Sequence, residues 1–313
     1  MLEHITQGLY YFEVHLLFAS IVGLVALVLT SIRGGSATTK YWIWVAAMLN
    51  FLLPVGAVLD KLLASYLGWA TPLGGIGDLA KSVIHSPSAG VFGMVWVLGA
   101  ILMFARLCFR IWAVRREDQA ANSQSALEPG RNFIAGGVPV RFAESRHAPA
   151  VHGFLRPHIS LPKGIERLLS KHELNAVLIH ELTHARRRDN LIRLIHEIGL
   201  CALWFHPLVW ISGSRLALYR ELSCDESVIK SARGSDLVSA LAKLAEPEEA
   251  FLLQASASSF LMARLPRLTA VQPQPRSRTA STVLVVLFGA VLLTCVVGTV
   301  AHTACCFVTK IKV

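Results

Sequence analysis

The sequence has 313 residues, a formal net charge of +10 and 54% hydrophobic residues, with a mean hydropathy of +0.53. The apolar residues are concentrated in long runs, which indicates an integral membrane protein and excludes an ordinary soluble enzyme. The positive charges flank these runs, so we expect no direct binding of nucleic acid.

Four apolar stretches approach or exceed the roughly 20 residues that a helix needs to cross a bilayer. They are residues 9–32, 41–63, 91–114 and 283–307. Lysine and arginine gather in the first loop, after the third stretch and before the fourth, and the positive-inside rule assigns these three places to the cytoplasm. We therefore expect a multi-pass protein of the cell (inner) membrane, with its N-terminus outside and a cytoplasmic domain between the third and fourth spans.

The predicted organisation has three parts. Residues 1–116 form a membrane region with three helices, residues 117–265 a cytoplasmic domain, and residues 266–313 a basic tether with the fourth transmembrane helix. Within the cytoplasmic part, VPVRFAES and HISLP have the residue pattern of short strands. The expected fold class is predominantly α, with four transmembrane helices and a cytoplasmic α+β domain.

Three helices are expected in the cytoplasmic part. Residues 170–190 form the first, with a capping box that begins at Ser170, and residues 213–232 form the third. Residues 191–212 form the second, which is apolar but carries charged residues and histidines that are costly at mid-membrane. We expect this second helix to be buried or to lie against the membrane, and to end or kink at Pro207.

The first of these helices contains the segment HELTHARRRD, residues 180–189. His180 and His184 are one turn apart, so both imidazoles can bind one metal ion, for which Zn²⁺ is the expected identity. Glu181 lies about 100° around the helix, where it can accept a proton from a water molecule and pass it to a leaving amine. The alternative to a zinc site is an amphipathic helix with two solvated histidines.

Charged residues follow the second histidine of this segment. On a continuous helix, Arg187 and Arg188 project near the face of the histidines, whereas Asp189 is almost opposite. We expect the two arginines to form a solvated cytoplasmic surface; binding of acidic lipid or of a substrate carboxylate is the alternative.

The segment RELSCDE, residues 220–226, offers a third metal ligand. Glu221 follows His184 by 37 residues, which leaves room for one intervening helix and gives a His, His, Glu site with its fourth position left for water. Asp225, one turn further on, can hydrogen-bond a ligand imidazole. Cys224 is a competing soft ligand, and an exposed acidic helix face is the alternative without a metal.

The order of motifs resembles a known family. The three N-terminal spans, GFLRPHISLP, HELTHARRRDN, WFHPLVW, RELSCDE and the fourth span follow the layout of the BlaR/MecR-type membrane zinc metallopeptidases, relatives of the HtpX and CAAX-protease gluzincins. The resemblance implies zinc on His180, His184 and Glu221, Glu181 as general base, and support of the site by Asp225. It also implies that the segment around HISLP is an edge strand that holds an extended substrate by backbone pairing.

BlaR and MecR proteins continue past the fourth span into a large extracellular penicillin-binding sensor domain, whereas this sequence stops at Val313. We therefore expect no sensing of β-lactams through a covalent serine.

The expected function is that of a membrane-embedded zinc endopeptidase with a regulatory role. Its expected substrate is a cytoplasmic or membrane-associated protein, such as a transcriptional repressor, or its own tether QPQPRSRTA. Other expected partners are the lipid bilayer and further copies of the chain in an oligomer. The alternatives are a signalling receptor or scaffold with a structural or silent zinc site, and a membrane quality-control protease.

Overall fold

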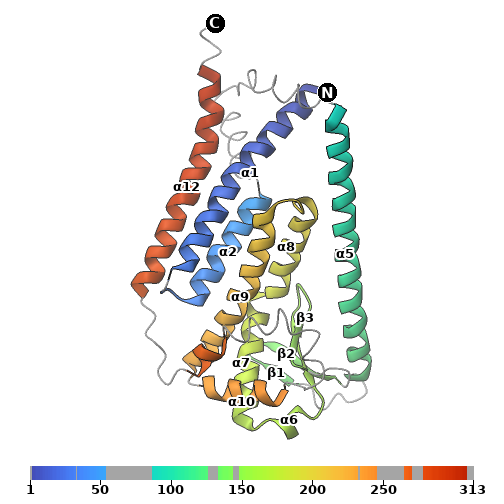
Figure 1. The fold of residues 1–313 in the computed structure, drawn as a ribbon. Helices are drawn as coiled ribbons and strands as arrows, with labels where there is room; N and C mark the ends of the chain where they lie inside the picture. The colour runs from blue at the N-terminus through green and yellow to red at the C-terminus, as the bar shows by residue number, and fades with distance from the viewer. Residues whose placement is uncertain are drawn as a thin grey trace.

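The computed structural model describes residues 2–32, 34–53, 87–125, 133–143, 148–231, 233–244, 264–269 and 278–308. Long helices occupy one end of the molecule, and a small sheet with shorter helices occupies the other (Figure 1). The helices are α1 (Leu2–Ser31), α2 (Ala37–Leu52), α5 (Pro87–Ser125), α6 (Ile165–Leu168), α7 (Lys171–Arg187), α8 (Asp189–Ala202), α9 (Pro207–Lys230), α10 (Gly234–Leu244) and α12 (Arg278–Val308). The strands are β1 (Phe133–Ala135), β2 (Val138–Ala143), β3 (Ala150–His152) and β4 (His158–Pro162).

Two of the described helices are long and apolar enough to cross a membrane. These segments, Gly93–Arg116 in α5 and Arg278–Cys295 in α12, overlap the third and fourth predicted spans. Helix α1 contains a shorter apolar segment, His15–Ser31. Helix α2 has 16 residues, about 24 Å of helix, and residues 54–63 of the second predicted span lie outside the described residues. The topology with four spans therefore stays a prediction.

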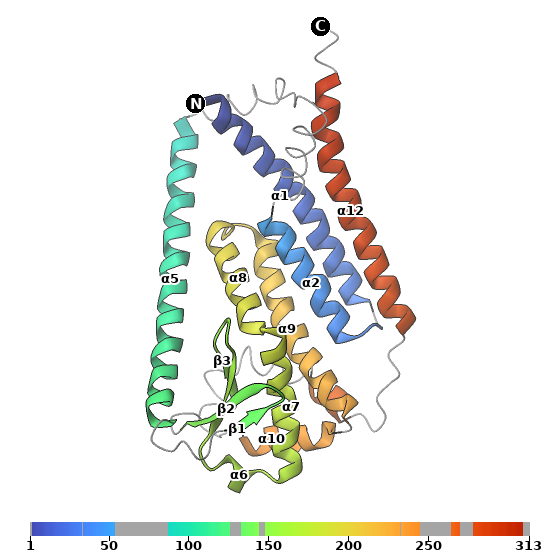
Figure 2. The same cartoon turned by 180° about the vertical axis from the view of Figure 1, so that it is seen from behind.

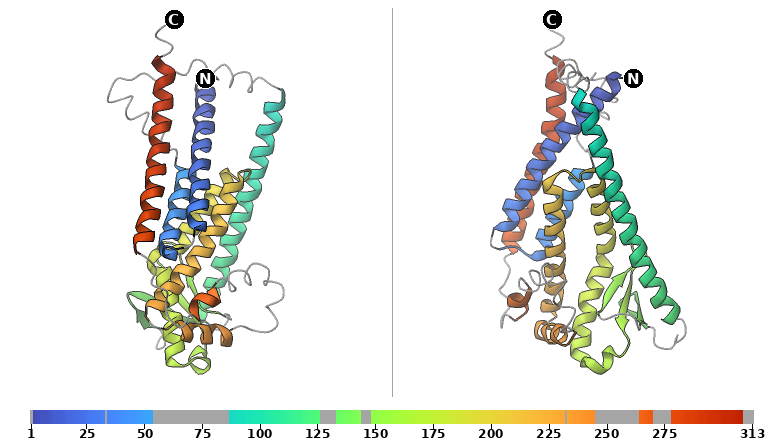
Figure 3. Two further views of the ribbon diagram at one scale, coloured as in Figure 1. Left: turned by 60° about the vertical axis from the view of Figure 1, so that its left-hand side comes forward. Right: turned by 45° about the vertical axis from the view of Figure 1, so that its right-hand side comes forward.

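Helices α8 and α9 form a hairpin that lies between α5 and the pair α1 and α2 (Figures 2 and 3). The helix predicted over residues 191–212 ends earlier than expected: α8 ends at Ala202, and α9 begins at Pro207. The predicted break at Pro207 is confirmed, because proline suits the first position of a helix but cannot continue one. Helix α9 therefore contains the end of the predicted second helix, residues 207–212, together with most of the predicted third helix, residues 213–232.

Aromatic side chains hold the tip of this hairpin among the long helices. The indole N–H of Trp204 donates to the Trp96 carbonyl of α5 at 3.2 Å, and the indole N–H of Trp96 donates to the Ala202 carbonyl at 3.0 Å. The Trp204 ring lies directly against Gly99, where a Cβ atom would clash. On the other side, His206 Nε2 lies 3.0 Å from the Ser20 hydroxyl of α1.

The sheet has the strand order β1-β2-β4-β3. Strand β4 pairs in parallel with β2 and antiparallel with β3, so that Ile159 pairs with both Val140 and Val151. The strand predicted for HISLP is thus confirmed as β4, but its expected place at the edge is wrong. The edge strand beside β4 is β3, which has only three residues and falls in a segment rich in turn residues.

Helix α9 belongs to two hydrophobic cores. Near its middle, Leu216 and Tyr219 pack with Tyr41 and Trp44 of α2. Near its end, Val228 packs with the core formed by the sheet and α7. The segment of α9 between these contacts is therefore fixed from both sides, and it faces α7.

Candidate metal centre

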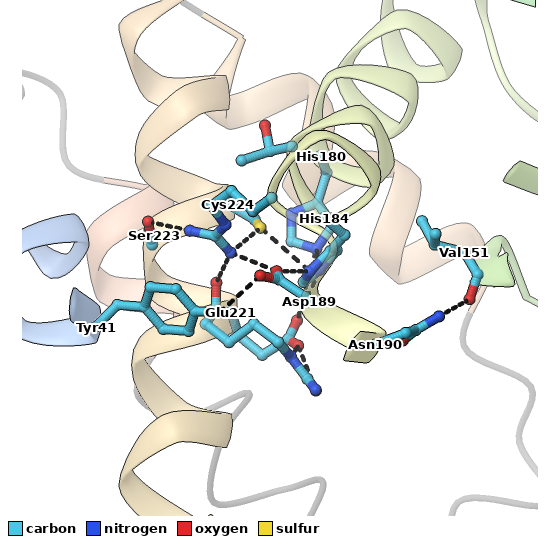
Figure 4. Close-up of polar contacts among 12 residues, drawn as sticks. Tyr41, Val151, His180, His184, Asp189, Asn190, Glu221, Ser223 and Cys224 are labelled. Atoms are coloured by element: carbon cyan, nitrogen blue, oxygen red, sulfur yellow. Dashed lines mark hydrogen bonds and ion pairs between the residues drawn. The ribbon is translucent and has the colours of Figure 1, made fainter. Parts of the chain in front are cut away.

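Helices α7 and α9 carry the residues of the predicted zinc site (Figure 4). The capping box predicted at the start of α7 is present: Ser170 accepts from the Glu173 N–H, and Glu173 accepts from the Ser170 N–H. Helix α7 ends at Arg187, and Arg188 has φ 54° and ψ 46°, the left-handed region that few non-glycine residues adopt. This residue turns the chain sharply into α8.

Three side-chain atoms converge between the two helices. The Nε2 atoms of His180 and His184 lie 3.2 Å apart, and Glu221 Oε2 lies 3.5 Å from the first and 3.9 Å from the second. In a tetrahedral zinc site with bonds of 2.0 to 2.1 Å, neighbouring ligand atoms are about 3.3 to 3.4 Å apart. The three atoms therefore fit a single metal ion of this kind.

The other nitrogen of each imidazole faces a buried carboxylate. His180 Nδ1 lies 3.2 Å from Asp225 Oδ1, and His184 Nδ1–H donates to Asp189 Oδ2 at 2.7 Å. Such carboxylates fix the orientation of metal-binding histidines and raise their basicity. Asp225 thus lies where the sequence places it, whereas the expectation that Asp189 points away from the histidines is wrong, because α7 ends before it.

The expectation that Arg187 belongs to a solvated surface is wrong, because its side chain is held inside this site. Its guanidinium donates to Asp189 Oδ2 and to the Ser223 hydroxyl, both at 2.6 Å. It also lies over the ring of Tyr41, 4.5 Å from the ring centre, and the Tyr41 hydroxyl donates to Asp189 Oδ1 at 2.7 Å. Helix α2 is therefore connected through Tyr41 and Asp189 to the candidate ligand His184.

Two further arginines hold the carboxylates of α9. Arg264 forms a bidentate ion pair with Asp225, with two N···O distances of 2.8 Å, and lies 3.7 Å from Glu221 Oε2. Arg220 lies 3.0 Å from Glu221 Oε1, the oxygen that points away from the histidines. In the sequence Arg264 is one of several cations before the fourth apolar stretch, and nothing there predicts its place at the metal centre.

The charges of the site shift several pKa values. Burial disfavours the charged imidazolium, but Asp225 and Glu221 outweigh it and raise the pKa of His180 to about 9. Burial acts to raise the pKa values of Glu221 and Asp225, but His180 and the nearby arginines hold both below their usual range. The metal-free cluster thus holds a proton at neutral pH, and a bound dication would replace it.

Cys224 offers a second set of metal ligands with the two histidines, because one ligand atom from each lies within 4.8 Å of the others. However, Cys224 Sγ lies 3.4 Å from His184 Nδ1, the atom that donates to Asp189. Burial also raises the pKa of the Cys224 thiol well above its usual value, which favours the poorly coordinating protonated form. The set with Glu221 is therefore the better fit.

Glu181 follows His180 on α7 and is partly buried. Within the part of the chain that the structure describes, its carboxylate makes no hydrogen bond or ion pair. The donor set of two histidines and Glu221 leaves one position of a tetrahedral metal for water. This arrangement is typical of a catalytic site, because structural zinc sites use four protein ligands.

The chain is similar to known proteins over most of its length. The family model described as BlaR1 peptidase M56 matches residues 11–268. The regulatory protein BlaR1 of Bacillus licheniformis is 28% identical over 254 residues, which cover 69% of this chain and 41% of that protein. The methicillin resistance mecR1 proteins of Staphylococcus aureus and Staphylococcus epidermidis are each 23% identical over 166 residues, or 49% of this chain and 28% of each relative. The chain thus spans less than half the length of these curated relatives.

Proposed function

Because the chain belongs to the BlaR1 peptidase M56 family, with relatives of the BlaR/MecR type, we propose that it is a membrane-embedded zinc endopeptidase. In this proposal His180, His184 and Glu221 hold the metal, Glu181 is the general base, and Asp225 orients His180. The observation that carries the proposal is the convergence of two Nε2 atoms and one carboxylate oxygen at separations of 3.2 to 3.9 Å.

The chemistry divides between the metal and the residues around it. A zinc ion held by His180, His184 and Glu221 would supply Lewis acidity toward the scissile carbonyl and would lower the pKa of a water molecule toward about 7. Glu181 accepts the proton of the attacking water and then donates it to the leaving amine, so that the amine departs in its neutral form. Asp225 and Asp189 keep both Nε2 atoms directed at the metal, and Arg220 keeps Glu221 Oε2 turned toward it.

The proposed orientation places the sheet and the metal centre in the cytoplasm and the N-terminus outside. Arginines occur at the end of α5 that lies nearest the sheet, and α12 begins with Arg278 at the same end of the molecule (Figure 1). Both placements agree with the positive-inside rule. The catalytic region therefore meets cytoplasmic or membrane-associated proteins.

The proposed role is regulatory cleavage of such a protein, of which a transcriptional repressor is one class, or cleavage of the tether of the chain itself. The contact between Arg264 and Asp225 supports the second target. Arg264 lies shortly before the tether in the sequence, so this contact keeps the chain that enters the tether close to the metal centre. Residues 270–277 of the tether lie outside the described residues.

The experiment that tests this function compares protein termini in membrane and cytosolic fractions of cells with the wild type and cells with Glu181→Ala. We expect new termini, in the tether or in a small set of other proteins, that depend on the wild-type enzyme. The same termini in both strains would exclude a peptidase that uses Glu181.

A further inference from the structure

A cavity of about 390 Å³ lies between α5, α8 and β3. It is next to the metal centre, because its lining residue Asn190 directly follows Asp189 and donates to the Val151 carbonyl of β3 at 2.9 Å. Its volume falls within the range of about 300 to 1,000 Å³ that is typical of small-molecule sites. Apolar side chains contribute to the lining, among them Leu107, Ile111, Val114 and Leu194.

Positive charge prevails in this cavity. Three arginines line it, Arg110, Arg115 and Arg193, against the two acidic residues Glu197 and Asp118. Arg115 and Arg193 form no ion pair with any residue that the structure describes. The site therefore offers two guanidinium groups to an anion, and guanidinium binds phosphate through paired hydrogen bonds.

The acidic side chains already have partners. The Glu197 carboxylate accepts from Arg106 and Arg110, each at 2.6 Å. The Asp118 carboxylate lies 3.0 Å from His158 Nε2. Both carboxylates are therefore engaged by other side chains, although Glu197 also attracts Arg193 electrostatically. The three arginines outnumber the two acidic residues of the lining, so the cavity would gain from a bound anion.

The position of the cavity indicates where this anion comes from. The candidate membrane span of α5, Gly93–Arg116, ends at the cavity, and Val114 and Arg115 are exposed there. Basic pockets at the cytoplasmic ends of spans are places where acidic lipid headgroups bind. The apolar part of the lining suits the first carbons of the lipid chains, which a soluble anion lacks.

We propose that this cavity binds the headgroup of an acidic membrane phospholipid, with the phosphate between Arg115 and Arg193 and the first chain carbons against the apolar residues of α5 and Leu194. The lipid joins the end of the span to α8 and β3, the elements beside the metal centre. This proposal does not depend on peptidase activity.

Native mass spectrometry of the full chain tests the proposal. The protein is released from detergent micelles that contain equal amounts of phosphatidylglycerol and phosphatidylcholine. We expect the wild type to retain more phosphatidylglycerol than phosphatidylcholine. In the double variant Arg115→Gln, Arg193→Gln the ratio of the two retained lipids should fall by about fivefold for each arginine replaced. The double variant Arg115→Lys, Arg193→Lys keeps the charge and should keep the preference.

The matched control is Arg167→Gln with Lys171→Gln, which removes the same charge from exposed positions of α6 and α7. It should retain phosphatidylglycerol as the wild type does, and the zinc content of all variants checks their folding. Equal retention of both lipids by the wild type, unchanged preference in the glutamine variant, or displacement by inorganic phosphate alone would overturn the proposal. An acidic peptide that binds without lipid and requires Arg115 and Arg193, while no lipid preference is seen, would assign the cavity to a protein partner.

Discussion

The Tyr41 hydroxyl of α2 donates to Asp189 Oδ1 at 2.7 Å, while the other oxygen of Asp189 accepts from His184 Nδ1, also at 2.7 Å. One buried carboxylate thus connects an N-terminal helix to a candidate zinc ligand. Arg187 stabilises the same carboxylate and packs on the Tyr41 ring. A movement of α2 would therefore change the position of His184, which gives a physical route from the membrane region to the metal.

Replacement of Tyr41 by phenylalanine tests this connection. Loss of a hydrogen bond to a charged group should lower the free energy of unfolding by about 1.5 to 3 kcal/mol. Loss of a partner that orients a ligand should also weaken zinc affinity by about tenfold. The measurement is a titration of zinc against a chelator.

Tyr219→Phe is the matched control. Tyr219 is also buried, and its hydroxyl donates to the Thr30 carbonyl at 2.8 Å, away from the metal centre. This variant should lose stability but keep wild-type zinc affinity. Equal zinc affinity in the Tyr41 and Tyr219 variants would show that α2 does not support the site.

Glu181 and Glu221 should give opposite results when each is replaced by alanine. Glu181→Ala removes the general base, so cleavage should fall by at least about 100-fold while the bound zinc is retained. Glu221→Ala removes a ligand, so the zinc content itself should fall. Cleavage by purified protein and zinc content by atomic absorption separate the two roles.

Glu166→Ala serves as the control for both variants, because Glu166 is exposed on α6. Full zinc occupancy in the Glu221 variant would remove Glu221 from the ligand set. In that case Cys224→Ser should lower the zinc content instead.

The sequence predicts those parts of the site that follow from the spacing of residues along a single helix. His180 and His184 share a face of one helix, and Glu221 and Asp225 share a face of another, so their proximity follows from helical spacing once the two helices pack together. The capping box and the break at Pro207 are equally local, and both are confirmed. The second predicted span, by contrast, extends into residues 54–63, which the structure does not describe.

The missed features depend on unusual backbone or on contacts distant in sequence. Asp189 reaches His184 only because Arg188 adopts a left-handed conformation, which is rare for arginine. Arg264 contacts Asp225 across 39 positions of the chain, and no periodic pattern predicts such a pair. The order of strands is also a property of the whole sheet, so the inner position of β4 could not be read from HISLP alone.

Zinc binding should release about one proton at neutral pH. The pKa of His180 in the metal-free protein is raised to about 9, so below this pH zinc must displace a proton from the cluster. Zinc affinity should therefore rise by about tenfold for each pH unit between 6.5 and 9. Calorimetric titration of zinc in buffers with different ionisation enthalpies counts the released protons.

The same pKa shift predicts the pH dependence of the metal-free protein. Because the folded-state pKa of His180 lies above its ordinary value of 6.5, its contribution to stability is fully present below pH 6.5. That contribution is lost as the pH rises through about 9. Zinc binding without proton release at pH 7.5 would contradict the protonated state of the cluster.

Arg264 should be essential for stability because it neutralises a buried carboxylate. Asp225 is only 1% exposed, and Arg264→Gln would leave it without its bidentate partner, at an expected cost of about 3 to 5 kcal/mol in the free energy of unfolding. Arg233→Gln is the control: its ion pair with Asp236 is long and partly exposed, and its loss should cost less than about 1 kcal/mol.

The double variant Arg264→Met, Asp225→Leu separates stability from metal binding. Replacing both charges by apolar side chains should recover much of the stability that Arg264→Gln loses, because no uncompensated charge stays buried. Zinc affinity should stay at least about tenfold weaker than in the wild type, since His180 Nδ1 no longer faces a carboxylate. Denaturant unfolding and zinc titration measure the two quantities, and wild-type zinc affinity in the double variant would show that Asp225 does not orient His180.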